Sequence, residues 1–102
     1  MKLITKEIIK RTPKLGAYAV EDTKDVVFTF KLFTPWSNWT WYISEANFET
    51  GRLFGLCCGF ENEWGYVDLN ELMEIRGPFG LKVERDLHFD PITYDDLLKK
   101  IA

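Results

Sequence analysis

The stretch DVVFTFKLFTPWSNWTWYIS, residues 25–44, consists of two apolar-rich runs on either side of a short loop. In each run apolar and polar side chains alternate, which is the pattern of a β-strand with one buried face. The loop, residues 34–38, contains proline, serine and asparagine, which favour turns. The stretch therefore predicts a β-hairpin, against which the rest of the chain must pack.

The aromatic residues of this hairpin divide between its two faces. Trp39 and Trp41 share one face, where each ring would remove about 150–250 Å² from water, so both are expected in the core. Trp36 lies in the loop, and Tyr42 lies on the reverse face. These two rings are expected to be exposed, and we predict that they contact a partner.

Beyond the hairpin, the chain predicts further strands and three short helices. Alternating patterns indicate strands over residues 53–60, 63–69 and 81–89. Each helix is expected to begin after a residue whose side chain can accept a hydrogen bond from the first turn. These capping residues are Thr5, Asp68 and Thr93, and the helices should run to about Arg11, to about Ile75 and to the C-terminus.

These elements describe one α+β domain that spans residues 1–102. Its sheet is expected to be mainly antiparallel, a meander of four to five strands, with helices at the N-terminus, before the last strand and at the C-terminus. Helices should cover one face of this sheet. The alternation assigns to that face Phe28, Phe30, Leu32, Trp39, Trp41, Ile43, Phe54, Leu56, Cys58 and Phe60.

The charge of the chain is small but unevenly distributed. A formal net charge of −3 is too small for a dedicated nucleic-acid mimic and has the wrong sign for a general phosphate binder. Basic residues gather in residues 1–16, where Lys6, Lys10 and Arg11 are expected on the wet side of the first helix. Residues 61–75 contain no basic residue and five acidic ones: Glu61, Glu63, Asp68, Glu71 and Glu74. Solvated faces explain such asymmetry most simply, although it can also steer a charged partner.

A cytoplasmic protein without a membrane partner is expected. The N-terminal residues lack the apolar run of a signal peptide, and no segment is long and apolar enough to cross a bilayer. Cys57 and Cys58 are adjacent, so in a strand they would point to opposite faces and not bond each other. With His88 as the only histidine they form no zinc site, and no cofactor is expected.

One row of side chains is compatible with metal-dependent chemistry. Glu84, Asp86 and His88 would stand on one face of the predicted strand 81–89, at intervals of about 7 Å. Such a row can bind a divalent cation or supply acid and base groups. No second cluster of ligands accompanies it, so a solvated strand face is favoured.

Arg85 interrupts the apolar face that Val83 and Leu87 would form on the same strand. A buried guanidinium requires a carboxylate or carbonyl partner, because an unpaired buried charge is costly. Glu63 or Glu45 is expected to provide it. A structural ion pair is favoured over an anion-binding role for Arg85.

Residues 76–80, RGPFG, combine two glycines with a proline and predict a turn. They lack the Gly-Lys-Ser/Thr ending and the strand-to-helix context of a phosphate-binding loop. Arg76 and Phe79 in this turn join Trp36 and Tyr42 as candidate protein-contact residues.

The strings FTPWSNWTWY, GLCCGFENEWGY and RGPFGLKVERDLHFDP resemble a family of small bacterial proteins, domain of unknown function 2958, whose members often occur in plasmids, conjugative elements and phages. The resemblance runs from the first helix to about Pro91. It implies no activity and no catalytic residue. Residence on mobile elements would favour a role in conflict with host defence or in plasmid maintenance.

The chain is therefore predicted to be a non-enzymatic interaction or regulatory protein whose partner is another protein. The first alternative is a nucleic-acid-binding accessory protein that uses the basic first helix and the aromatic residues Trp36, Tyr42 and Trp64. The second alternative is a metal-dependent enzyme with the Glu84, Asp86 and His88 site. The oligomeric state stays open.

Overall fold

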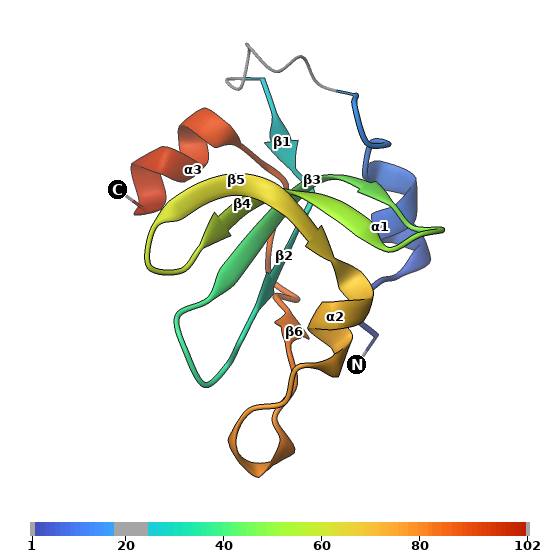
Figure 1. Ribbon diagram of the computed structural model, residues 1–102. Coiled ribbons are helices and arrows are strands. Elements are labelled where there is room, and N and C mark those ends of the chain that lie inside the picture. The colour runs from blue at the N-terminus through green and yellow to red at the C-terminus, as the bar shows by residue number, and fades with distance from the viewer. Residues whose placement is uncertain (1, 18–24, 102) are drawn as a thin grey trace.

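The computed structural model describes residues 2–17 and 25–101, which form an α+β fold (Figure 1). Its helices are α1 (Lys6–Arg11), α2 (Leu69–Glu74), the short 3₁₀ turn η1 (Pro78–Gly80) and α3 (Tyr94–Ile101). Its strands are β1 (Val27–Phe28), β2 (Phe30–Phe33), β3 (Thr40–Asn47), β4 (Arg52–Cys58), β5 (Asn62–Asp68), β6 (Glu84–Arg85) and β7 (Ile92–Thr93). The predicted hairpin is the β2–β3 pair. The predicted fold class is confirmed.

The main sheet is antiparallel and has five strands in the order β5-β4-β3-β2-β6. Strands β2 to β5 form the predicted meander, because each pairs with the next along the chain. Strand β6 then returns to the free edge of β2, where Arg85 lies opposite Leu32. A separate two-stranded sheet joins β1 to β7, with Val27 opposite Thr93.

All three predicted helix caps are confirmed. The Thr5 side chain accepts a hydrogen bond from the Ile8 amide at 3.3 Å, and Asp68 accepts one from Asn70 at 2.8 Å. Thr93 accepts one from the Asp96 amide at 3.2 Å. Each bond satisfies an amide at a helix start that has no partner within its own helix.

The prediction of one buried sheet face is wrong, because apolar residues pack on both faces. The first cluster lies under α1 and α2 and contains Ile8, Phe30, Leu32, Trp41, Ile43, Ala46, Leu53, Leu72 and Val83. The second lies under α3 and contains Val26, Phe28, Tyr42, Leu56 and Leu97. Figure 1 shows α3 on the opposite side of the sheet from α1 and α2.

Two details of strand pairing explain why the predicted core divides. Trp41 pairs with Cys57, and Tyr42 pairs with Leu56, so Leu56 shares the face of Tyr42 and not that of Trp41. Between β1 and β2 the chain breaks at Thr29, which places Phe28 and Phe30 in different clusters. The alternation of side chains within one strand predicts neither the pairing register nor the break at Thr29.

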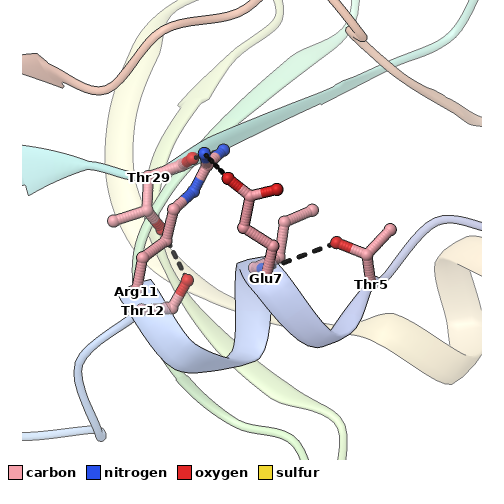
Figure 2. A network of polar contacts seen from close by, with 6 residues as sticks. Thr5, Glu7, Arg11, Thr12 and Thr29 are labelled. Carbon is pink, nitrogen blue, oxygen red and sulfur yellow. Dashed lines mark hydrogen bonds and ion pairs between the residues drawn. The ribbon is translucent and has the colours of Figure 1, made fainter.

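A buried polar network fixes α1 to the sheet at this break (Figure 2). The Nη2 atom of the Arg11 guanidinium donates to the Thr29 carbonyl at 2.6 Å, and its Nη1 atom lies 3.8 Å from a Glu7 carboxylate oxygen. The hydroxyls of Thr12 and Thr29 are 2.7 Å apart, and the Thr29 amide donates to the Ile43 carbonyl at 2.8 Å. Arg11 therefore points toward the sheet, and its expected place on the wet side of α1 is wrong.

Two residues expected in the core lie on the surface. Trp39 is 38% exposed and Phe60 is 96% exposed, because both lie at turns beyond the ends of the paired strands. Trp41 is buried as predicted.

In the described part of the chain, no helix has the length and the apolar character that crossing a bilayer requires.

Candidate functional site

The loop formed by residues 76–82 projects from the body of the fold, at the bottom of Figure 1. Arg76 and Lys82 form an antiparallel bridge at its base, and the Gly77 amide donates to the Leu81 carbonyl at 2.7 Å. The 3₁₀ turn η1 makes its tip, with Pro78 at the first position. Proline is suited to that position because its φ is already helical and it has no amide to leave unpaired. The predicted turn is confirmed and is an ordered hairpin-like loop.

Phe79 lies at the tip with its side chain completely exposed. Its φ is 58°, in the left-handed region, where a side chain costs roughly 1 kcal/mol or more. Within the described residues it is the one residue other than glycine with positive φ, and its ring packs against no other aromatic ring. In the free protein, the strained backbone of Phe79 therefore holds a large apolar ring in water.

Trp36 supports this loop from the β2–β3 connection. Its indole covers Gly77, where an added Cβ would overlap the ring. The connection itself is held by a hydrogen bond between the Thr34 and Ser37 hydroxyls and by the Thr34 amide, which donates to the Trp39 carbonyl at 3.0 Å. The structure thus brings the candidate residue Trp36 against the loop that carries Phe79. Trp36 is half-buried and is therefore less exposed than expected.

Arg76 contacts α2 as well as the loop. Its guanidinium Nη1 donates to the carbonyls of Met73 at 2.7 Å and of Ile75 at 2.9 Å. These carbonyls lie at the end of α2, where the helix leaves acceptors without partners. The contact fixes the direction in which the loop leaves α2, although the Arg76 side chain is still exposed.

A hollow of about 490 Å³ lies at the base of the loop. Apolar side chains from the N-terminal segment, α2 and the approach to β6 line it, and three basic side chains stand at its margin. The apolar residues are Leu3, Ile4, Leu69, Met73 and Val83, and the basic ones are Lys2, Arg76 and Lys82. Such a hollow suits an apolar side chain flanked by acidic residues.

Tyr42 does not belong to this surface, and its expected exposure is wrong. Only 7% of the residue is exposed, because it lies in the second cluster beside Phe28 and Phe89. Burial, aided by Cys58 and Asp86, raises the pKa of its hydroxyl. The ammonium group of Lys31 lies 5.6 Å from the centre of the Tyr42 ring. Because the residue is buried, Tyr42 is a core residue.

Arg85 pairs with backbone carbonyls, and the predicted ion pair with Glu63 is wrong. Its Nη1 donates to the carbonyls of Lys2 at 2.6 Å and of Leu3 at 2.9 Å. Glu63 lies on β5, at the opposite edge of the sheet from β6, with three strands between them. Arg85 instead fixes the N-terminal segment that lines the hollow.

Glu84, Asp86 and His88 do not form the predicted row. The strand ends after Arg85, and the chain then turns, with the His88 amide donating to the Asp86 carboxylate at 2.9 Å. The same carboxylate lies 3.5 Å from the Lys31 ammonium group. Across residues 2–17 and 25–101, no three His, Cys, Asp or Glu side chains are placed to hold a metal ion.

Each of the aromatic residues named for nucleobase stacking is buried or half-buried. Trp36 lies on Gly77, and Tyr42 is buried. The Trp64 ring stacks on Phe28 at 5.5 Å and meets the edge of Tyr94 at 5.0 Å between ring centres. Arg11 is engaged by the sheet, whereas Lys6 and Lys10 are exposed on α1, so the basic helix keeps two of the three cations named for it.

Sequence reasoning missed a second aromatic turn, between β4 and β5. Trp39 covers Gly59, where an added Cβ would overlap its ring, and the exposed Phe60 meets Trp39 edge-on at 5.7 Å. Trp39 also stacks on Trp41 at 6.3 Å. The sequence signal was a glycine close to an aromatic residue in a turn, adjacent in Gly59-Phe60 and separated by Pro78 in the case of Gly77 and Phe79.

Comparison with known proteins gives a family and no activity. No curated protein and no solved structure matches the chain. Residues 3–95 match the family described as "Protein of unknown function (DUF2958)", which covers α1, every strand of the five-stranded sheet and the 76–82 loop. On this match, the chain belongs to the DUF2958 family.

Proposed function

We propose that the protein acts by contact with another protein through its loop surface, which we define as Trp36, Met73, Arg76, Phe79 and Lys82 with the adjoining hollow. The observation that carries the proposal is Phe79, an exposed ring on a strained backbone at the tip of an ordered loop. Strained residues persist where the surrounding structure holds them, and they concentrate at binding and catalytic sites.

The energetics favour binding at this position. Burying a phenylalanine side chain contributes about 1.5–3 kcal/mol, which exceeds the strain of its left-handed backbone. Because the loop is already braced by Trp36 and by the Arg76 contacts, little ordering is needed when a partner arrives. Aromatic and arginine side chains together are typical of the residues that dominate protein interfaces.

The charges around the hollow indicate the partner's chemistry. Lys2, Arg76 and Lys82 surround an apolar floor, so a complementary segment would insert an apolar side chain between acidic residues. The sequence resemblance adds the prediction that this partner belongs to a host defence or plasmid-maintenance system. That prediction rests on context alone.

A capture experiment with two matched phenylalanines tests the proposal. Wild-type protein, Phe79→Ala and Phe60→Ala are immobilised at equal density and exposed to nuclease-treated extract of the native host. Both replaced rings are almost completely exposed, but they lie on different turns. We expect a protein that wild type and Phe60→Ala retain and that Phe79→Ala loses by about tenfold.

Two results would contradict the proposal. Equal capture by wild type and Phe79→Ala would show that the loop surface does not bind the partner. Capture from a parallel untreated extract that is absent from the nuclease-treated one would instead favour the nucleic-acid alternative.

A further inference from the structure

The strand β5 (yellow in Figure 1) forms one edge of the main sheet and lies apart from the 76–82 loop. Within the described part of the chain β5 pairs only with β4, so its other edge has no strand beside it. The Leu69 amide donates to the Gly51 carbonyl at 2.8 Å, which makes Gly51 and Leu69 a hydrogen-bonded pair in the register. By alternation, Glu63, Gly65 and Val67 direct their backbone groups toward β4.

The backbone groups of Asn62, Trp64 and Tyr66 consequently point outward from the sheet. A row of free amides and carbonyls at every second residue is the template that an added strand requires. Native proteins commonly block such edges with lysine, proline or a bulge. β5 contains neither lysine nor proline, and its register with β4 is regular over all seven residues.

The edge is strongly acidic. Residues 61–75 contain five acidic and no basic residues, and Glu61 and Glu63 are exposed at the start of β5. β5 has no basic residue that could neutralise the acidic side chains of a second copy, and this excess of negative charge disfavours pairing of β5 with itself. An extended segment that carries lysine or arginine is the complementary occupant.

A hollow beside the edge of β5 adds a second requirement for a segment that binds there. Gly65 pairs with Gly55, and a Cβ added at Gly65 would meet nothing within 4 Å. The resulting hollow has a volume of about 240 Å³ and is lined by Trp41, Cys57 and Val67 among others. Glu63 stands beside it on the same face of β5, two residues before Gly65.

We propose that β5 binds an extended segment of another protein as a sixth strand of the sheet. The segment would place a lysine or arginine beside Glu63 and a large apolar side chain beside Gly65, where the hollow receives it. Because these two neighbours are two residues apart on β5, they are also two residues apart on the added strand. The recognised pattern is therefore a basic residue and a bulky apolar residue separated by one position.

The test uses a defined probe, a capped peptide of alternating threonine and lysine with one central leucine two residues from a lysine. Three control peptides replace the lysines by glutamate, replace the leucine by glycine, or carry N-methyl groups on the amides that would face β5. We expect each control to bind about tenfold more weakly or worse, measured by fluorescence anisotropy. In the complex, hydrogen exchange at the Trp64 and Tyr66 amides should slow.

A matched pair of protein variants tests the backbone contact. Tyr66→Pro removes an outward amide and leaves the β4–β5 hydrogen bonds intact, whereas Tyr66→Ala removes only the ring, which contacts Phe54 and Arg52. Binding should survive Tyr66→Ala within about threefold and fall by tenfold or more in Tyr66→Pro. Phe79→Ala should bind the peptide as wild type does, so this test and that of the proposed function fail independently.

Three outcomes would overturn the proposal. The first is that the lysine peptide does not bind at its highest soluble concentration, and the second is that its glutamate counterpart binds as well. The third is a dimer in sedimentation that Tyr66→Pro dissociates, which would show that a second copy occupies the edge.

Discussion

Two turns of this protein are built in the same way and differ in one respect. In the β4–β5 turn, Trp39 covers Gly59 beside the exposed Phe60, and in the 76–82 loop, Trp36 covers Gly77 near the exposed Phe79. Both tryptophans come from the same short connection between β2 and β3. Phe60 contacts Trp39, whereas Phe79 has no aromatic neighbour among the described residues and a left-handed backbone.

This difference shows that exposure alone does not identify a recognition residue. Phe60 contributes to its own turn through an edge-to-face contact, which is an adequate structural reason for its presence. Phe79 contributes no such contact and adds strain. The comparison therefore favours a structural role for Phe60 and supports the binding role that we propose for Phe79, and three sets of variants can break or sharpen it.

The largest effects are expected from a methyl group under each tryptophan. Gly77→Ala and Gly59→Ala both place a Cβ against an indole, so each ring must shift, at a cost of about 1–3 kcal/mol. We expect the larger loss of stability from Gly77→Ala, because Trp36 is half-buried and Trp39 is freer to move. Chemical denaturation measures both values.

Binding distinguishes the same two variants. Gly77→Ala should also weaken partner capture, because it displaces the loop that carries Phe79, and Gly59→Ala should not. If both variants weaken capture equally, the two turns form one surface and the comparison fails. Trp36→Ala combined with Gly77→Ala supplies the control, since removing the ring should relieve the clash.

The second set replaces the phenylalanines themselves, and the expected changes have opposite signs. Phe79→Gly relieves the left-handed strain and should raise the free energy of unfolding by about 0.5–1 kcal/mol, net of the entropy that glycine costs. Phe60→Ala loses its contact with Trp39 and should lower it by about 0.5–1 kcal/mol. Thermal unfolding of the two proteins under one condition gives the comparison directly.

A loss of stability in Phe79→Gly would show that the ring makes contacts that hold the loop. Phe79→Ala is the control for size, because it removes the ring but keeps the strained backbone. Its stability should remain close to that of the wild type.

The smallest effect is expected from alkaline pH, and it concerns the strand that leads into the Phe60 turn. Burial raises the pKa of the Cys57 and Cys58 thiols above their usual value of 9.0. The unfolded chain therefore releases these protons at lower pH than the folded protein does. Stability should be complete below about pH 9 and fall as the pH rises past it.

Denaturation curves at about pH 7 and about pH 10 measure this loss. In Cys57→Ala/Cys58→Ala the loss should shrink, leaving the share due to Tyr42, whose hydroxyl pKa is raised from 10.0. Phe79→Gly should leave the pH dependence unchanged. A pH dependence that persists in full without the thiols would show that other groups cause it.

The sequence predicts those parts of the fold that depend on neighbouring residues in the chain. The β2–β3 hairpin, the three caps at Thr5, Asp68 and Thr93, and the turn at residues 76–80 all follow from local chemistry. The helix predicted to end near Arg11 does so. These features need only periodicity, capping and turn preferences.

What the sequence could not predict depends on register and on contacts between distant segments. The split of Phe28 from Phe30 requires knowledge of the break at Thr29, and the burial of Tyr42 requires knowing that α3 covers its face. Arg85 could not be assigned to the Lys2 and Leu3 carbonyls, because 82 or more residues separate them in the chain.

The candidate site was predicted in part for the same reason. Phe79 and Arg76 belong to a turn pattern that is local in the sequence. The support of the loop by Trp36 depends on the packing of its ring over Gly77, which lies far from Trp36 in the chain. The free edge of β5 follows from the order of the strands in the sheet. The residue pattern of β5 itself does not predict that order.

The position of Phe79 also offers a site for proteolytic cleavage of the chain. An exposed aromatic residue at the tip of a projecting loop is a natural target for chymotrypsin-like proteases. A cut there leaves β6, β7 and α3 on a short C-terminal piece, while their partners β2 and β1 remain on the long one. We expect the two pieces to stay associated through these strand pairs, so a single cut at the loop should leave the fold assembled.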